Sequence, residues 1–99
     1  MSSTSFEVFW THNAKEDLKN IYVSLKGNIS KEVARKIREE LFNSSDLITF
    51  PEQFQLDEYR SDCRRLIVRD YKILYQFKDD SIFIIRVFNT LQDPSKSMR

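Results

Sequence analysis

The sequence predicts an α+β domain in which an antiparallel pair of helices packs on a small antiparallel sheet, in the order β-α-α-β-β-β. Three observations support this prediction. Two stretches in the first half carry apolar residues at helical spacing, the second half alternates with a period of two, and a β-forming segment precedes both helices. A length of 99 residues is typical of one domain, so we assign residues 1–99 to a single domain.

The first two elements are a strand and a helix. Residues 6–10 are rich in β-forming side chains, and this strand should join the sheet because a lone strand leaves its backbone groups unsatisfied. Thr11 or Asn13 is the expected N-cap of the helix, and Gly27 with Asn28 suits a left-handed helix end. The apolar stripe of this helix consists of Ala14, Leu18, Ile21, Tyr22 and Leu25.

A second helix follows after a short turn, which predicts an antiparallel helix pair. Ser30 is its expected N-cap. Its stripe is Val33, Ala34, Ile37 and Leu41, and the charged residues between the stripes should face solvent. Pro51 stops helical structure at Phe50, and residues 51–61 should form a polar loop with Phe54 and Leu56 tucked beneath it.

The last third predicts three consecutive strands that form an antiparallel meander, with a hairpin turn at Asp79-Asp80-Ser81. The alternation places Tyr71 and Tyr75 in the core, and it puts Arg86 on the same side of its strand as Ile82. Residues 90–99 are polar and should form a loosely ordered tail.

Composition and charge exclude several classes of protein. No apolar run approaches the ~18 residues that span a bilayer, and no signal peptide is visible, so we expect a cytoplasmic protein without membrane contact. A single cysteine, Cys63, excludes an intramolecular disulfide and a cysteine-built zinc site, and we expect neither metal nor cofactor. The net charge is +1, but residues 60–72 carry five cations against two carboxylates, a local charge of +3.

Four segments in the chain carry a family resemblance. They are residues 10–18 (WTHNAKEDL), 64–68 (RRLIV), 71–77 (YKILYQF) and 82–90 (IFIIRVFNT), the last followed by Gln92-Asp93-Pro94. In order and spacing, they resemble the helix start and the three closing strands of the RelE/ParE superfamily of bacterial toxins from type II toxin–antitoxin pairs. The resemblance extends over nearly the whole chain and implies the same β-α-α-β-β-β order.

The resemblance also implies a function. It suggests a growth-inhibiting toxin of the plasmid-stabilisation type that is neutralised by a cognate antitoxin, and it favours ParE-like action on DNA gyrase. The alternatives are a RelE-like endoribonuclease that cuts mRNA on the ribosome without metal, and an inactive relic that only binds antitoxin. Leu91 stands where the family usually has Arg, which disfavours the nuclease. An exposed edge strand could pair two copies into a homodimer or receive the antitoxin.

Arginines on the predicted strands are the candidate site residues. Cleavage of RNA through the 2′-hydroxyl needs a base, an acid and a cation that stabilises the phosphorane. Arg65 and Arg69 share one face of a regular strand and could form a phosphate clamp with Arg86, since guanidinium groups bind phosphate bidentately. Solvated strand arginines are the alternative. The residues expected to bind nucleic acid or the target are Arg64, Arg65, Arg69 and Lys72.

Overall fold

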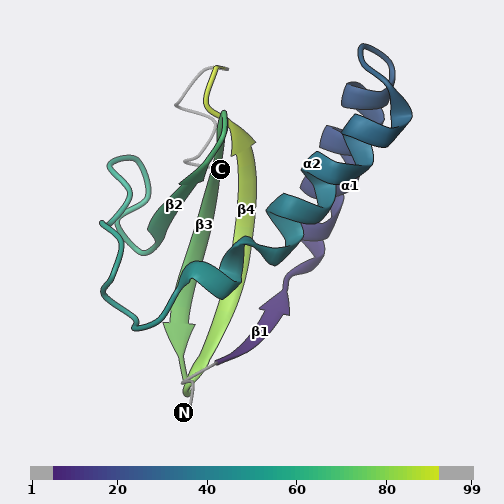
Figure 1. Cartoon of the computed structure of the whole chain (residues 1–99). Helices are drawn as coiled ribbons and strands as arrows, with labels where there is room; N and C mark the ends of the chain where they lie inside the picture. Colours follow the sequence, from purple (N-terminus) through teal and green to yellow (C-terminus); the bar gives the residue numbers. More distant parts are fainter. Residues whose placement is uncertain (1–5, 92–99) are drawn as a thin grey trace.

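The computed structural model describes residues 6–91 and confirms the predicted order of elements (Figure 1). A short 3-10 helix that the sequence did not predict follows the second α-helix. The predicted tail at 90–99 lies mostly outside the described residues. The elements are β1 (Glu7–Trp10), α1 (His12–Lys26), α2 (Lys31–Phe42), η1 (Asn43–Leu47), β2 (Arg64–Val68), β3 (Tyr71–Lys78) and β4 (Ser81–Asn89).

The four strands form one sheet in the order β1-β4-β3-β2. The meander is antiparallel as predicted, but β1 pairs parallel with β4, so the sheet is mixed rather than wholly antiparallel. The physical reason is the crossover: the two helices carry the chain away from β1, and β4 returns beside it in the same direction. Figure 1 shows β1 at one edge of the sheet, below the helices.

Both helices begin at the N-caps that the sequence predicts, but α1 does not end in the predicted conformation. The hydroxyl of Thr11 accepts the N–H of Ala14, and that of Ser30 accepts the N–H of Val33. The prediction of a left-handed end at Gly27 is wrong, because its φ is −81°. The Nδ2 of Asn28 instead donates to the carbonyl of Ser24 at 2.8 Å, which satisfies a terminal acceptor of α1.

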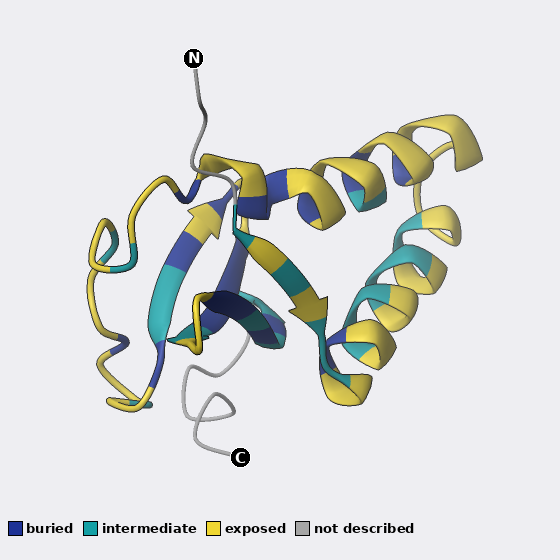
Figure 2. Ribbon diagram, turned by 90° about the horizontal axis from the view of Figure 1, so that it is seen from below, coloured by how far each residue is buried: buried dark blue, intermediate teal, exposed yellow. Residues whose placement is uncertain are grey.

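The hydrophobic core lies between the helices and one face of the sheet (Figure 2). Both helices turn their buried sides inward and leave their outer sides exposed. Phe54 packs on the buried ring of Tyr75, as the sequence predicted, whereas Leu56 is exposed rather than tucked beneath the loop. The central core residues are Ala14, Leu41, Leu66, Ile73, Tyr75, Ile82, Ile84 and Val87.

A β-bulge in β4 changes the face to which Arg86 belongs. Leu74 pairs with Arg86 and the next residue, Tyr75, pairs with Ile84, so Ile85 is an extra residue in β4. The extra residue reverses the alternation, which places Val87 in the core and Arg86 on the opposite face from Ile84. The expectation that Arg86 lies on one side with Ile82 is therefore wrong.

Helix α1 covers the edge of β4 beyond the point where β1 ends. The hydroxyl of Thr11 lies 2.8 Å from the carbonyl oxygen of Ile84 and 3.1 Å from that of Ile85. The Oδ2 of Asp17 accepts the N–H of Val87 at 2.9 Å. The side chains of Asp17 in α1 and of its N-cap Thr11 thus take the place of a neighbouring strand. In the described part of the chain, neither helix has the length and apolar character that a membrane span requires.

Candidate functional site

The sheet has a second face, turned away from the core cluster, on which three of the predicted site residues lie. Leu66, Ile73 and Val87 form a core row across the three strands of the meander. Because adjacent residues of a strand point to opposite faces, the next row points away from the core. That row is Arg65, Leu74 and Arg86, and the row beside it is Ile67, Lys72 and Phe88.

Arg65 and Lys72 are each held by a carboxylate from the loop that precedes β2. The guanidinium of Arg65 lies 3.7 Å from the Oε1 of Glu58, and its Nη2 donates to the side-chain oxygen of Gln55 at 3.1 Å. The Nζ of Lys72 lies 2.8 Å from the Oδ1 of Asp57. The loop over residues 51–63 is therefore fastened to this face of the sheet by charge.

The pair between Asp57 and Lys72 is the most deeply buried ion pair among the described residues. The side chain of Asp57 is 0% exposed and that of Lys72 is 10% exposed. Burial raises the pKa of the Asp57 carboxyl, but hydrogen bonds from Lys72 and from the N–H groups of Tyr59 and Arg60 outweigh it. The pKa of Asp57 therefore lies below its ordinary value.

Arg86 is bound to α1 through Asp17. Its Nε donates to the Oδ2 of Asp17 at 2.7 Å and its Nη2 donates to the Oδ1 at 3.0 Å, which is a bidentate pair. The hydrogen bond to Asp17 raises the pKa of the Arg86 guanidinium further above its ordinary range. The guanidinium carbon also lies 5.0 Å from the centre of the Phe88 ring.

Arg64 and Arg69 lie apart from this group. Arg64 is in register with Tyr75 on the core side, and its Nη1 donates to the carbonyl of Phe54 at 2.8 Å. Arg69 is not in a regular strand: it has a φ of 55° in the turn after β2, and its Nε donates to Glu40 of α2 at 2.7 Å. The structure thus brings Arg65, Lys72 and Arg86 to one face and separates the other two from them.

Sequence reasoning missed the three acidic partners of these cations. Asp57 and Glu58 lie in the loop expected to be simply polar, and no local pattern marks them. Asp17 had a detectable signal, since it lies three residues after Ala14 and four before Ile21, within the apolar side of α1. A carboxylate at such a position needs a buried partner.

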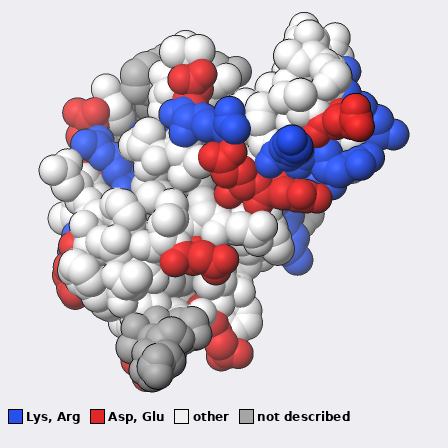
Figure 3. Space-filling model, viewed as in Figure 1, with Lys and Arg blue, Asp and Glu red and all other residues white. Residues whose placement is uncertain are grey.

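Charged side chains are distributed unevenly over the molecule. Figure 3 shows that many of the Lys and Arg side chains on the face viewed there lie over the projecting helices, with Asp and Glu side chains beside them. Each ion pair within residues 6–91 involves a cation of the sheet or of its loops. Within residues 6–91, no three metal-binding side chains lie close enough together to hold an ion.

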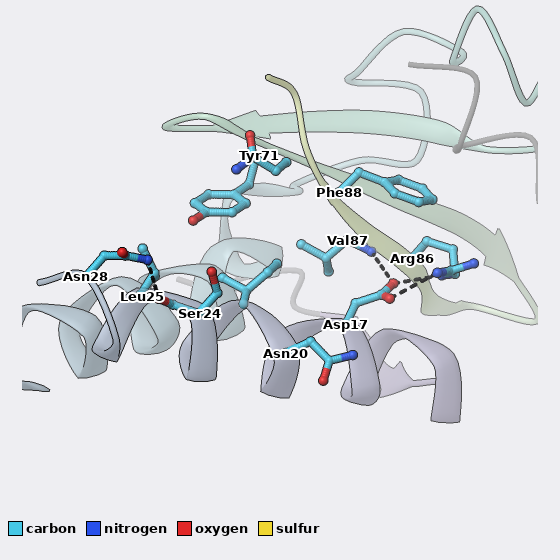
Figure 4. A pocket seen from close by; sticks show the side chains of 11 residues that line it. Asp17, Asn20, Ser24, Leu25, Asn28, Tyr71, Arg86, Val87 and Phe88 are labelled. Carbon is cyan, nitrogen blue, oxygen red and sulfur yellow. Dashed lines mark hydrogen bonds and ion pairs between the residues drawn. The ribbon is translucent and has the colours of Figure 1, made fainter. Parts of the chain in front are cut away.

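A groove of about 490 Å³ lies between α1 and the ends of β3 and β4 (Figure 4). The pair of Asp17 and Arg86 lies at one end of it, and Asn28 lies at the other. Tyr71 reaches it from β3. The lining combines amide and hydroxyl groups with the apolar side chains of Leu25 and Val87, which suits a peptide more than a compact small molecule.

Comparisons with known proteins agree with this architecture. The solved structures that resemble the chain include the chromosomal ParDE toxin–antitoxin system from P. aeruginosa (21% identity, TM-score 0.75, covering 88% of this chain and 98% of that one). They also include the RelBE2 toxin–antitoxin complex from Mycobacterium tuberculosis (20% identity, TM-score 0.56, 85% and 90%). A mutant of the E. coli toxin RelE in the free state matches with 16% identity and a TM-score of 0.55, over 95% and 93% of the two chains.

These structural likenesses, all at low identity, establish the fold. No curated protein sequence matches the chain at a significant level. The model of one sequence family matches residues 8–94, which is nearly the whole chain, and that family is described as the ParE toxin of the type II toxin–antitoxin system parDE. The chain therefore belongs to the ParE toxin family of type II toxin–antitoxin systems, within the RelE/ParE superfamily.

Proposed function

We propose that this toxin arrests bacterial growth by ParE-like action on DNA gyrase in the cytoplasm, as part of a plasmid-stabilisation type of system. The observation that carries the proposal is the pairing of the sheet cations. Arg65, Lys72 and Arg86 each have a carboxylate partner within the chain, at 3.7, 2.8 and 2.7 Å. A phosphate would have to displace these carboxylates before the cations could stabilise a phosphorane, which disfavours RNA cleavage at this face.

A cognate antitoxin is the proposed partner that holds the toxin inactive. The structural neighbours from P. aeruginosa and M. tuberculosis belong to toxin–antitoxin systems. The groove between α1 and β4 offers apolar side chains beside amides that can bind a peptide backbone. An antitoxin segment that folds on binding would fit there, and it would lie against the pair of Asp17 and Arg86.

The test is a paired incorporation assay after tightly induced expression in a bacterial host. Labelled thymidine and labelled amino acid are followed in one culture, with an empty-vector culture as the control. Gyrase poisoning predicts an early fall in thymidine incorporation while protein synthesis continues. Purified gyrase should then lose supercoiling activity when the toxin is added. An early fall in protein synthesis, with replication persisting, would contradict the gyrase proposal.

The RelE-like endoribonuclease is a second candidate because Arg65 and Arg86 lie in one row across the sheet, separated only by Leu74. Two guanidiniums on one face are the part of a phosphate clamp that the sequence predicted. If this candidate holds, Arg65→Ala abolishes toxicity while the circular dichroism spectrum stays that of the folded protein. An Arg65→Ala variant that stays fully toxic excludes it. Continued growth with both syntheses intact would contradict both candidates and favour the third reading, an inactive relic.

A further inference from the structure

The helical hairpin of α1 and α2 is rich in cations that have no carboxylate partner within residues 6–91. It contains seven Lys and Arg side chains, and within residues 6–91 none of them forms an ion pair. The hairpin also carries five carboxylates, but Asp17 and Glu40 bind Arg86 and Arg69 of the sheet side. Only Glu16, Glu32 and Glu39 remain to oppose the seven cations, so the hairpin is more basic than its sequence indicates.

Six of these cations lie along one side of the hairpin. On α1 they follow the helical repeat, with Tyr22 at the position between Lys19 and Lys26, and on α2 they are spaced four and three residues apart. The guanidinium carbon of Arg38 lies 4.4 Å from the centre of the Tyr22 ring, which joins the two rows. We call this surface the basic seam; it consists of Lys15, Lys19, Lys26, Lys31, Arg35 and Arg38.

The seam projects away from the body of the protein. Figure 1 shows the hairpin extending beyond the sheet, and Figure 3 shows its Lys and Arg side chains on the surface. The ring of Tyr22 is half-buried between Arg38 and the Nζ of Lys26, which lies 5.5 Å from the ring centre. These contacts restrain two of the cations in position before any partner binds, and cation–π contacts leave the positive charge in place.

We propose that the basic seam binds the phosphate backbone of duplex DNA. The row from Lys15 to Lys26 extends about 16 Å at 1.5 Å per residue, which is close to five base-pair steps of one strand. An acidic protein segment would also be attracted, but the aromatic ring of the seam, Tyr22, is half-buried between two cations and offers such a segment little apolar surface. The choice of DNA over RNA rests on the proposed action on gyrase, whose substrate is duplex DNA.

Binding of a labelled 20-base-pair DNA duplex to the purified toxin, followed by fluorescence anisotropy at several salt concentrations, tests the inference. Each phosphate contact adds about −0.9 to the slope of log K against log salt. Lys26→Gln should therefore make the slope shallower by about 0.9. The triple variant with Lys19, Lys26 and Arg35 all changed to Gln should make it shallower by about 2.7 and weaken binding at every salt concentration.

Lys36→Gln is the matched control. Lys36 is exposed on α2 and loses the same charge, but it lies next to Arg35 along the chain and so points about 100° away from the seam. The slope of log K against log salt for Lys36→Gln should equal that of the unchanged protein. Equal losses in Lys36→Gln and Lys26→Gln would overturn the proposal, because binding would then follow net charge rather than the seam. Absence of DNA binding at low salt would overturn it as well.

Two further ligands separate the alternatives. An RNA duplex of the same sequence that binds more tightly than the DNA would overturn the assignment to DNA. Poly-glutamate that binds through the seam while DNA does not would show that the surface receives an acidic protein segment instead. Gyrase is absent from these measurements, so a failure of the gyrase proposal in cells leaves the result on the seam intact, and the two failures are distinguishable.

Discussion

Asp17→Asn should destabilise the fold, because Asp17 joins α1 to β4 through three hydrogen bonds. Two come from the guanidinium of Arg86, at 2.7 and 3.0 Å, and one comes from the N–H of Val87, at 2.9 Å. The side chains of Asp17 and Arg86 are only 14% and 23% exposed. The substitution keeps the shape of the side chain and an acceptor for Val87, but it removes the negative charge beside a mostly buried guanidinium.

The expected size follows from this geometry. Hydrogen bonds to charged groups contribute about 1.5–3 kcal/mol each, and breaking a fully buried pair costs about 3–5 kcal/mol. Solvent screens this pair in part, and the amide retains one acceptor, so we expect a loss of about 2 kcal/mol. A domain of this size has about 5–15 kcal/mol of stability, so this is a substantial part of the total. Because each kcal/mol lost lowers the melting temperature of such a domain by about 4–8 °C, the expected decrease is roughly 8–16 °C.

Urea unfolding followed by circular dichroism measures this loss. Glu16→Gln is the matched control, since the neighbouring carboxylate is exposed on the same helix, and its removal should change the free energy of unfolding by less than about 0.5 kcal/mol. A double-mutant cycle with Arg86→Met then isolates the coupling between the two side chains. If Asp17→Asn and Glu16→Gln change the stability equally, the pair does not stabilise the junction and the reasoning is refuted.

Three further predictions concern other described contacts. Because the pKa of Asp57 is lowered in the folded state, the free energy of unfolding should hold above pH ~4 and fall as the pH drops through that lowered pKa. Urea titrations at several pH values measure this dependence, and Asp57→Asn should flatten it. Thr11→Val should cost about 1–2 kcal/mol, more than Ser30→Ala, because Thr11 also binds two carbonyls of β4. The thiol of Cys63 is buried, and burial raises its pKa, so iodoacetamide should label it slowly at pH 8 until urea unfolds the chain. Fast labelling of the folded protein would contradict this burial.

Local patterns predicted the parts of the fold that depend on local spacing. The stripes of both helices are confirmed except at Val33, which is exposed, and at Tyr22, whose ring lies against cations of the seam instead of in the core cluster. The caps at Thr11 and Ser30 and the meander with its turn at Asp79-Asp80 are confirmed. Both turn residues have positive φ, at 53° and 60°, which is the geometry of a two-residue hairpin. Each of these features depends on residues within one or two helical turns or one strand pair, where periodicity carries the information.

The features that sequence reasoning missed depend on distant partners or on a change of phase. The parallel pairing of β1 with β4 joins residues that are remote along the chain, and nothing in residues 6–10 indicates its direction. The extra residue at Ile85 is hidden in a run of apolar side chains, so a regular alternation assigned Arg86 to the wrong face. The site residues Arg65, Arg69 and Lys72 were identified as cations, but their acidic partners could not be paired with them without the fold.

The parallel strand β1 has a consequence for the order of folding. The contacts that hold β1 and the residue after it against β4 join residues far apart along the chain. Thr11 and Ile84, for example, are separated by 73 positions. The helical hairpin and the meander can each form from neighbouring residues, whereas closing a loop of this length is slow relative to either. Folding should therefore end with the docking of β1 and α1 on β4, and agents that bind the exposed edge of β4 before this step would trap the toxin unassembled.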